Sequence, residues 1–277
     1  MIGVIAVMTL REIAQRRLSW VLVGLGLAFL VVYGVGLWAI EREVAQEGAA
    51  AVFRGQAASA FFVVGLYVIN FLVLVLGVIV SVDTLSGEIA SGTVHTIVTK
   101  PLRRADVVLG KLVGHLVVVG AFLAVMGLGA HALVGATLGP VSGDLVPALA
   151  LMLLEAVIVL GLSYLGGALT GTLANGLVVF MLYALALVGS WIERIGAALG
   201  SASAQYVGIV ASLLMPTEVL WQRAAWGLLP PLFRQVEFGF TPFTAANQPS
   251  PAMIGYAGLY ALAAVALAVR AFSRRDL

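Results

Sequence analysis

The sequence contains no cysteine and little charge. Without cysteine the chain has no disulfide, no thiolate metal ligand and no cysteine nucleophile. Charged residues make up 10% of the 277 residues, whereas hydrophobic residues make up 62%. A soluble domain carries roughly 25% charged residues, because its surface faces water. The composition therefore predicts an integral membrane protein.

The sequence also lacks the motifs of an ATPase or a metal-dependent enzyme. A P-loop needs Gly, four residues, and then Gly-Lys followed by Ser or Thr, so that backbone N–H groups and the Lys hold phosphate and the hydroxyl binds Mg²⁺. The run Gly110–Leu112 lacks both the earlier Gly and the hydroxyl. No Ser-His-Asp or HExxH set occurs, and metal-ligand spacing is absent among His95, His115 and His131. We expect no catalytic residue, and no metal, cofactor or nucleic acid bound by this chain.

Six apolar segments are long enough to cross a membrane. A spanning helix needs ~20 largely apolar residues, because the hydrocarbon core is about 30 Å thick and each residue rises about 1.5 Å. The segments are Leu18–Ile40, Ala60–Val82, Val107–Leu138, Leu145–Leu169, Leu173–Trp191 and Ala252–Phe272. The first exceeds a signal-peptide core of about 7–15 residues, so we expect it to remain as an anchor. The sequence predicts an all-α polytopic protein whose single transmembrane domain covers residues 1–277.

Basic residues predict that both termini are cytoplasmic. Loops rich in Lys and Arg are retained on the cytoplasmic side of a membrane. Ten of the fifteen basic residues lie before the first span, around the second-to-third connection or at the C-terminus: Arg11, Arg16, Arg17, Lys100, Arg103, Arg104, Lys111, Arg270, Arg274 and Arg275. This distribution predicts a multi-pass protein of the cell (inner) membrane.

Two segments are predicted to lie at the membrane surfaces. Residues 1–17 alternate apolar and basic positions at helical spacing, which indicates a helix on the inner leaflet; contact with a cytoplasmic partner is equally open. Residues 192–251 form a long outer loop. Its aromatic and charged residues suit the headgroup layer: Pro216, Glu218, Trp221 and Arg223. We interpret the loop as an amphipathic anchor over the bundle, with a site for an outer accessory protein as the alternative.

A polar stretch, residues 83–106, separates the second and third spans. Val94 and Ile97 are apolar, and their exposure to water would be unfavourable. We therefore expect a short amphipathic helix that lies on lipid or in a groove of another protein. Pro101 ends this helix, because the residue before a proline is forced into an extended conformation. Lys111 is expected to reach the headgroups from the start of the third span.

This stretch resembles the signature of the permeases of ABC type-2 exporters, which is a Glu, a short gap, Gly-Thr, Pro-x-x-Arg and a later Gly-Lys. The matching residues are Glu88, Gly92, Thr93, Pro101, Arg104, Gly110 and Lys111. The basic N-terminal segment, the six spans and the outer sequence from Leu214 to Arg223 are similar too, so the resemblance covers most of the chain. A narrower similarity is to the permease of the system that matures nitrous oxide reductase.

The resemblance implies a division of labour between polypeptides. In this family two permease copies form the pathway, separate cytoplasmic ATPases bind ATP and Mg²⁺, and the loop after the second span docks on the ATPase as a coupling helix. On this sequence the implied docking residues are Glu88, Gly92, Thr93, Val94, Ile97, Pro101, Arg104 and Lys111. The alternative for the loop is a solvated turn with headgroup-anchoring charges. The resemblance then implies that the chain is a transport subunit and not itself an enzyme. Two copies are expected to form a homodimer in contact with membrane lipid.

Polar residues within the spans are the remaining candidates. Glu155 lies in the fourth predicted span, where an ionised carboxylate costs on the order of 3 kcal/mol. It either lines a substrate path or is protonated and hydrogen-bonded between helices, and both readings stay open. Asn70 in the second span is a second intramembrane polar residue. Packing hydrogen bonds are expected from it and from Ser163, Tyr164, Thr170 and Asn175.

Two other functions compete with that of an ABC permease. An ion-coupled secondary transporter would use Glu155 and would show internal repeats and broken helices, which the sequence does not clearly show. A membrane-embedded enzyme would need polar groups converging from facing helices. Only Glu155 is placed for such a role.

Overall fold

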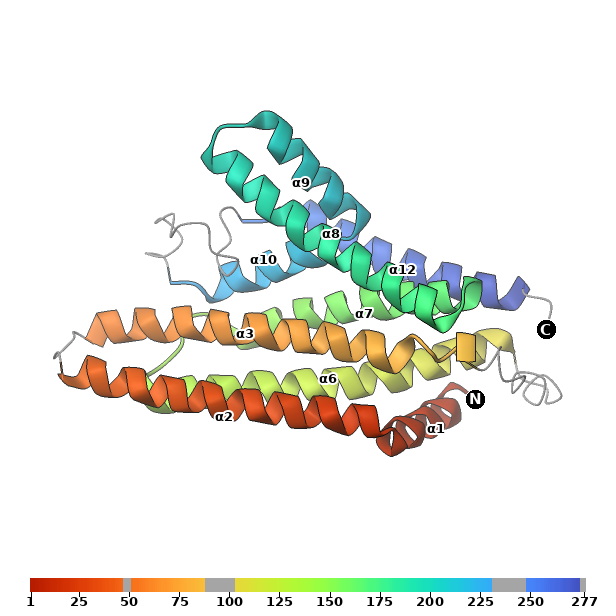
Figure 1. Cartoon of the computed structure of the whole chain (residues 1–277), viewed down its shortest axis with the longest axis horizontal. Coiled ribbons are helices and arrows are strands. Elements are labelled where there is room, and N and C mark those ends of the chain that lie inside the picture. Colours follow the sequence, from red (N-terminus) through yellow and green to blue (C-terminus); the bar gives the residue numbers. More distant parts are fainter. Residues whose placement is uncertain (47–50, 88–102, 231–247, 275–277) are drawn as a thin grey trace.

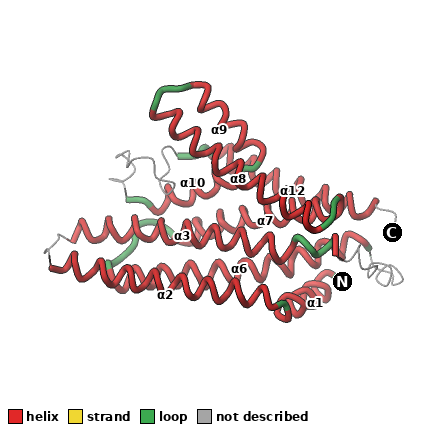
Figure 2. Tube along the Cα trace, in the orientation of Figure 1, coloured by secondary structure: helices red, strands yellow, loops and turns green. Residues whose placement is uncertain are grey.

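The computed structural model describes residues 1–46, 51–87, 103–230 and 248–274, and within these ranges the chain is helical and has no strand (Figures 1 and 2). The predicted all-α fold is confirmed. The helices are α1 (Ile2–Gln15), α2 (Arg17–Gln46), α3 (Ala51–Ser81), α6 (Arg104–Thr137), α7 (Leu145–Leu169), α8 (Thr172–Ala198), α9 (Ala202–Leu214), α10 (Thr217–Leu228) and α12 (Pro251–Arg274).

Six helices are long and apolar enough to span a membrane, and they coincide with the six predicted segments: α2, α3, α6, α7, α8 and α12. Several are longer than predicted from hydropathy. α2 continues past Ile40 to Gln46, and α3 begins at Ala51 rather than Ala60. The added residues are mostly good helix formers such as Ala, Glu, Gln and Arg, so the helices extend beyond their apolar cores.

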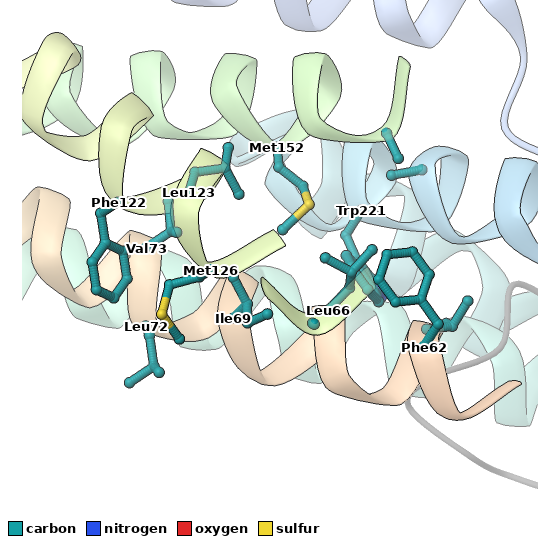
Figure 3. Close-up of a cluster of buried hydrophobic side chains, with 14 of the residues drawn as sticks. Phe62, Leu66, Ile69, Leu72, Val73, Phe122, Leu123, Met126, Met152 and Trp221 are labelled. Carbon is teal, nitrogen blue, oxygen red and sulfur yellow. The ribbon is translucent and has the colours of Figure 1, made fainter. Parts of the chain in front are cut away.

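The bundle is built around α3. It contacts α2, α6, α7 and α10, and its side chains Phe62, Leu66 and Ile69 are fully buried. Figure 3 shows these residues beside Met126 of α6 and Trp221 of α10. Because lipid is as apolar as these side chains, close van der Waals packing rather than water exclusion holds such helices together. Both termini lie at the same end of the bundle (Figure 1).

The short N-terminal helix α1 packs on the first turns of α6. Two glycines one turn apart on α6 permit this contact. A Cβ on Gly110 would lie 2.7 Å from the Cβ of Ile5, and a Cβ on Gly114 would lie 2.8 Å from the Cβ of Thr9. The opposite side of α1 exposes apolar residues, including Met8 at 64%. The predicted helix is therefore present, and its position on the inner leaflet stays a prediction.

Residues 192–230, expected to belong to a long outer loop, are almost entirely helical. α8 continues to Ala198, α9 runs back along it, and α10 enters the bundle against α3, α7, α8 and α12 (Figure 1). Small residues draw α8 and α9 together: a Cβ on Gly196 would lie 2.5 Å from the Cβ of Ala204. α10 has 12 residues, four of which are Thr, Glu, Gln and Arg, so hydropathy placed it outside the bundle.

Candidate functional site

A polar cluster lies inside the bundle where α3, α7, α8 and α10 meet. Its first part joins the two residues that sequence analysis singled out separately. The side-chain amide of Asn70 in α3 donates to Oε2 of Glu155 in α7 at 2.9 Å. Asn70 is 3% exposed and Glu155 is fully buried. The two residues therefore meet as an interhelical hydrogen-bonded pair.

The second part of the cluster is a buried ion pair between α8 and α10. Nη2 of Arg194 lies 2.9 Å from Oε1 of Glu218. Ser190 is shared by this pair: its hydroxyl accepts from Arg194 at 2.7 Å and from Gln222 at 2.8 Å, and it lies 3.3 Å from Oε1 of Glu218. Burial raises the pKa of Glu218 to about 7, and Arg194 and Ser190 oppose that rise. Arg194 thus favours the ionised carboxylate.

The two parts are electrostatically connected. The carboxyl of Glu155 is close enough to that of Glu218 for the two to repel each other. The hydroxyls of Tyr67 in α3 and Tyr183 in α8 lie within electrostatic range of both carboxyls. Glu218 has a cationic partner, whereas Glu155 has no ion pair among the described residues. The cluster therefore holds two carboxyls and one guanidinium.

Two side-chain oxygens of the Asn70–Glu155 pair have no hydrogen-bond partner among the described residues. They are Oε1 of Glu155 and Oδ1 of Asn70, and both are buried. Buried polar atoms of this kind are rare, since each forfeits the hydrogen bonds that water would supply. With Glu155 ionised, both atoms are acceptors and what they lack is a donor; a protonated Glu155 would carry its own donor.

Two aromatic pairs come from the helices that form the cluster. Tyr67 packs edge-on against Trp221, with ring centroids 5.3 Å apart. The ring centroids of Tyr183 and Phe71 lie 6.4 Å apart. Phe71 is 47% exposed, Tyr67 and Tyr183 are half-buried, and Trp221 is 1% exposed. One pair, Phe71 and Tyr183, thus includes an exposed ring, whereas the other includes the buried Trp221.

Two of the four residues predicted to lie in the outer headgroup layer are instead buried in the bundle. Trp221 and Glu218 are 1% and 4% exposed and face the interior of the bundle, and Pro216 is buried at the turn between α9 and α10. Arg223 is half-buried, and its guanidinium meets the side-chain oxygen of Gln248 when that amide is oriented to satisfy both groups. Sequence composition identified this polar group of residues, but the helix packing turned two of them inward.

Most of the predicted docking residues fall in residues 88–102, outside the described residues: Glu88, Gly92, Thr93, Val94, Ile97 and Pro101. The two that follow are described. Arg104 begins α6 and donates to the carbonyl of Ser273 in α12 at 3.3 Å. Lys111, expected to reach the headgroups, is 6% exposed and lies within the bundle beside the α1 contact.

A hydrogen-bond network that sequence analysis missed connects the helices just before residues 88–102. Nε2 of His115 in α6 lies 2.7 Å from the carbonyl of Val80 near the end of α3, and Nδ1 lies 2.8 Å from the hydroxyl of Tyr164 in α7. Nδ1 also lies 2.8 Å from the carbonyl of Lys111, so each ring nitrogen faces a backbone acceptor. The tautomer decides which nitrogen donates, and only an unprotonated Nδ1 accepts from the Tyr164 hydroxyl. Sequence analysis expected a packing hydrogen bond from Tyr164, but it assigned His115 no role.

The turn formed by residues 82–87 has further ties. Oδ1 of Asp83 accepts from the hydroxyl of Thr172 at 3.1 Å, and Oδ2 lies 3.8 Å from Arg16 at the α1–α2 junction. The amide of Asn175 in α8 donates to the carbonyls of Val82 and Ser163. The start of the predicted coupling segment is therefore attached to α1, α7 and α8.

The fold and the site together define a multi-pass helical membrane protein with a polar interior, the architecture of a permease. Residues 6–277 match the sequence model of a family described as ABC-2 family transporter protein, and the chain belongs to this family. It is a membrane permease of an ATP-binding cassette transporter, as the resemblance implied. The family does not favour an ion-coupled carrier. No curated protein matched the sequence.

Proposed function

We propose that this chain forms the translocation pathway of an exporter in the cell (inner) membrane, with both termini cytoplasmic and a separate cytoplasmic ATPase as its engine. ABC-2 family membership supports a membrane subunit of such a transporter. The chain has no P-loop, so ATP and Mg²⁺ are bound by the partner polypeptide. Two permease copies complete the pathway, as the resemblance implies.

The observation that carries the pathway proposal is the Asn70–Glu155 pair. A polar pair buried among apolar helices is costly in a membrane and commonly marks a substrate or ion route. Glu218, Arg194 and the tyrosine hydroxyls extend the polar surface across α8 and α10. We assign the pathway to the surfaces of α3, α7, α8 and α10 that meet at this cluster.

The proposed mechanism is alternating access driven from the cytoplasmic end. ATP binding closes the ATPase pair, and the docked segment, residues 88–99, moves with it. The turn of residues 82–87 precedes this segment, and its contacts with Arg16 and Thr172 carry the displacement to α1 and α8. His115 carries it to α6 and α7. The bundle then opens toward the outside.

The test first asks whether a coding sequence beside this chain encodes a P-loop ATPase. That ATPase is then co-expressed with the chain, and the two are purified in lipid. Glu88→Gln is expected to leave membrane insertion intact and to weaken ATPase copurification or the coupling of ATP hydrolysis to transport at least fivefold. Glu43→Gln, at an exposed position of α2, is the matched control. If Glu88→Gln copurifies and exports like the wild type, the docking assignment is wrong. A preparation of this chain alone that transports would overturn the proposed function.

A further inference from the structure

We infer that the Asn70–Glu155 pair recognises a cationic organic group, so that the transported substrate carries an ammonium centre. The inference rests on the proposed function, because it assigns a substrate class to the same pathway. It depends on the charge balance of the cluster, on the atoms left without partners and on the aromatic rings that the same helices contribute.

The charge balance leaves one carboxylate uncompensated. Arg194 is held by Glu218 and Ser190, with its Nη2 2.9 Å and 2.7 Å from their oxygens. Glu155 has Asn70 as its hydrogen-bond partner and repels Glu218. Among the described residues no cation pairs with it. An uncompensated carboxylate buried in a membrane protein is neutralised by a cation or a proton.

The unpartnered atoms select the sign and type of ligand. One N–H of Asn70 donates to Oε2 of Glu155, which leaves the Asn70 oxygen and, with the carboxyl ionised, Oε1 of Glu155 as acceptors. An ionised Glu155 would repel an anionic group, and neither unpartnered oxygen can donate to a neutral acceptor. An ammonium group supplies both the positive charge and several N–H donors.

The aromatic rings favour an organic cation over a hydrated metal ion. The helices that form the cluster also contribute four rings in two contacting pairs, Tyr67 with Trp221 and Phe71 with Tyr183, and Phe71 is exposed. Aromatic faces attract ammonium and quaternary nitrogen cations, and their apolar surface accommodates attached carbon chains. Glu155 is fully buried here, so a ligand reaches it only when α3 and α8 separate during the transport cycle.

The test is direct binding to the purified chain in phosphatidylcholine nanodiscs, a lipid without net charge. The probes are monodansylcadaverine, a fluorescent primary amine, and dansylamide, its neutral counterpart. We expect fluorescence polarisation to show binding of the amine, at least tenfold tighter than that of dansylamide. Glu155→Gln should weaken amine binding at least tenfold, and Asn70→Ala should weaken it less. Glu43→Gln, at an exposed end of α2, should bind as the wild type does.

Several outcomes would overturn the inference. One is equal amine affinity for the wild type and for a Glu155→Gln variant whose unfolding temperature is unchanged. Another is dansylamide binding as tightly as the amine. A third is Na⁺ stabilising the wild type through Glu155 while the amine fails to bind, which would make the pair a metal-cation site. ATPase copurification is measured separately: ATP-driven export without amine binding would overturn this inference alone, and amine binding without an ATPase partner would overturn the proposed function alone.

Discussion

At the residue scale, two buried carboxyls in the same cluster differ in their partners. Glu218 has a guanidinium 2.9 Å away, and Glu155 has an amide at the same distance. A buried ion pair contributes little over an apolar pair of the same shape, but removal of one partner is costly. Glu218 therefore ties α10 to α8, whereas Glu155 retains a free acceptor for a ligand.

The ion pair gives a stability prediction. Arg194→Gln should destabilise the protein by about 3 kcal/mol, because it leaves the carboxylate of Glu218 buried without its counterion. The double variant Arg194→Gln/Glu218→Gln should be more stable than Arg194→Gln, since the charge is removed as well. Thermal unfolding in lipid nanodiscs measures both. Equal unfolding temperatures for the single and double variants would show that the pair is not coupled.

At the element scale, short helices are positioned by small residues and by buried rings. α1 lies on α6 through Gly110 and Gly114, and α9 lies on α8 through glycine and alanine contacts. α10 is held in the bundle by Trp221, which is 1% exposed and packs against Tyr67. Hydropathy found the long helices, because each must be apolar over the thickness of a bilayer. It did not locate α10, whose burial depends on partners distant in sequence.

The α1–α6 contact yields a prediction that exploits the natural absence of cysteine. Gly114→Val should displace α1, because even a Cβ there would lie 2.8 Å from the Cβ of Thr9. In a Thr9→Cys background, where the side chain is 2% exposed, maleimide labelling should rise severalfold when Gly114→Val is added. Gly36→Val is the control, since no atom lies within 4 Å of a Cβ at that position. Labelling that does not respond to Gly114→Val would contradict the packing.

At the scale of the whole molecule, the termini that are predicted to be cytoplasmic and the contacts of the turn of residues 82–87 lie at the same end of the bundle. Both termini lie at that end (Figure 1), and the turn of residues 82–87 is attached there to α1 and α8. The charge distribution predicts that this end faces the cytoplasm. A docked ATPase that moves would therefore displace the turn of residues 82–87, which is hydrogen-bonded to α8, and α8 also contributes residues to the polar cluster.

Orientation can be measured with single cysteines in the cysteine-free chain. Glu43→Cys and Ser273→Cys place thiols at exposed positions near opposite ends of the bundle. In intact spheroplasts a membrane-impermeant maleimide should label Glu43→Cys, and Ser273→Cys should be labelled only after the membrane is opened. The reverse pattern would show that the charge-based topology is inverted.

The sequence by itself determined the membrane class, the six spans and the residue types of the candidate site. These properties depend on local composition and length, because a bilayer imposes the same requirement on every spanning helix. Only the tertiary structure decided that Asn70 pairs with Glu155 and Glu218 with Arg194, that Trp221 is buried, and that His115 bridges three helices. Those contacts depend on which helix faces pack together, and the rotation of one apolar helix against another is set by the combined fit of many side chains.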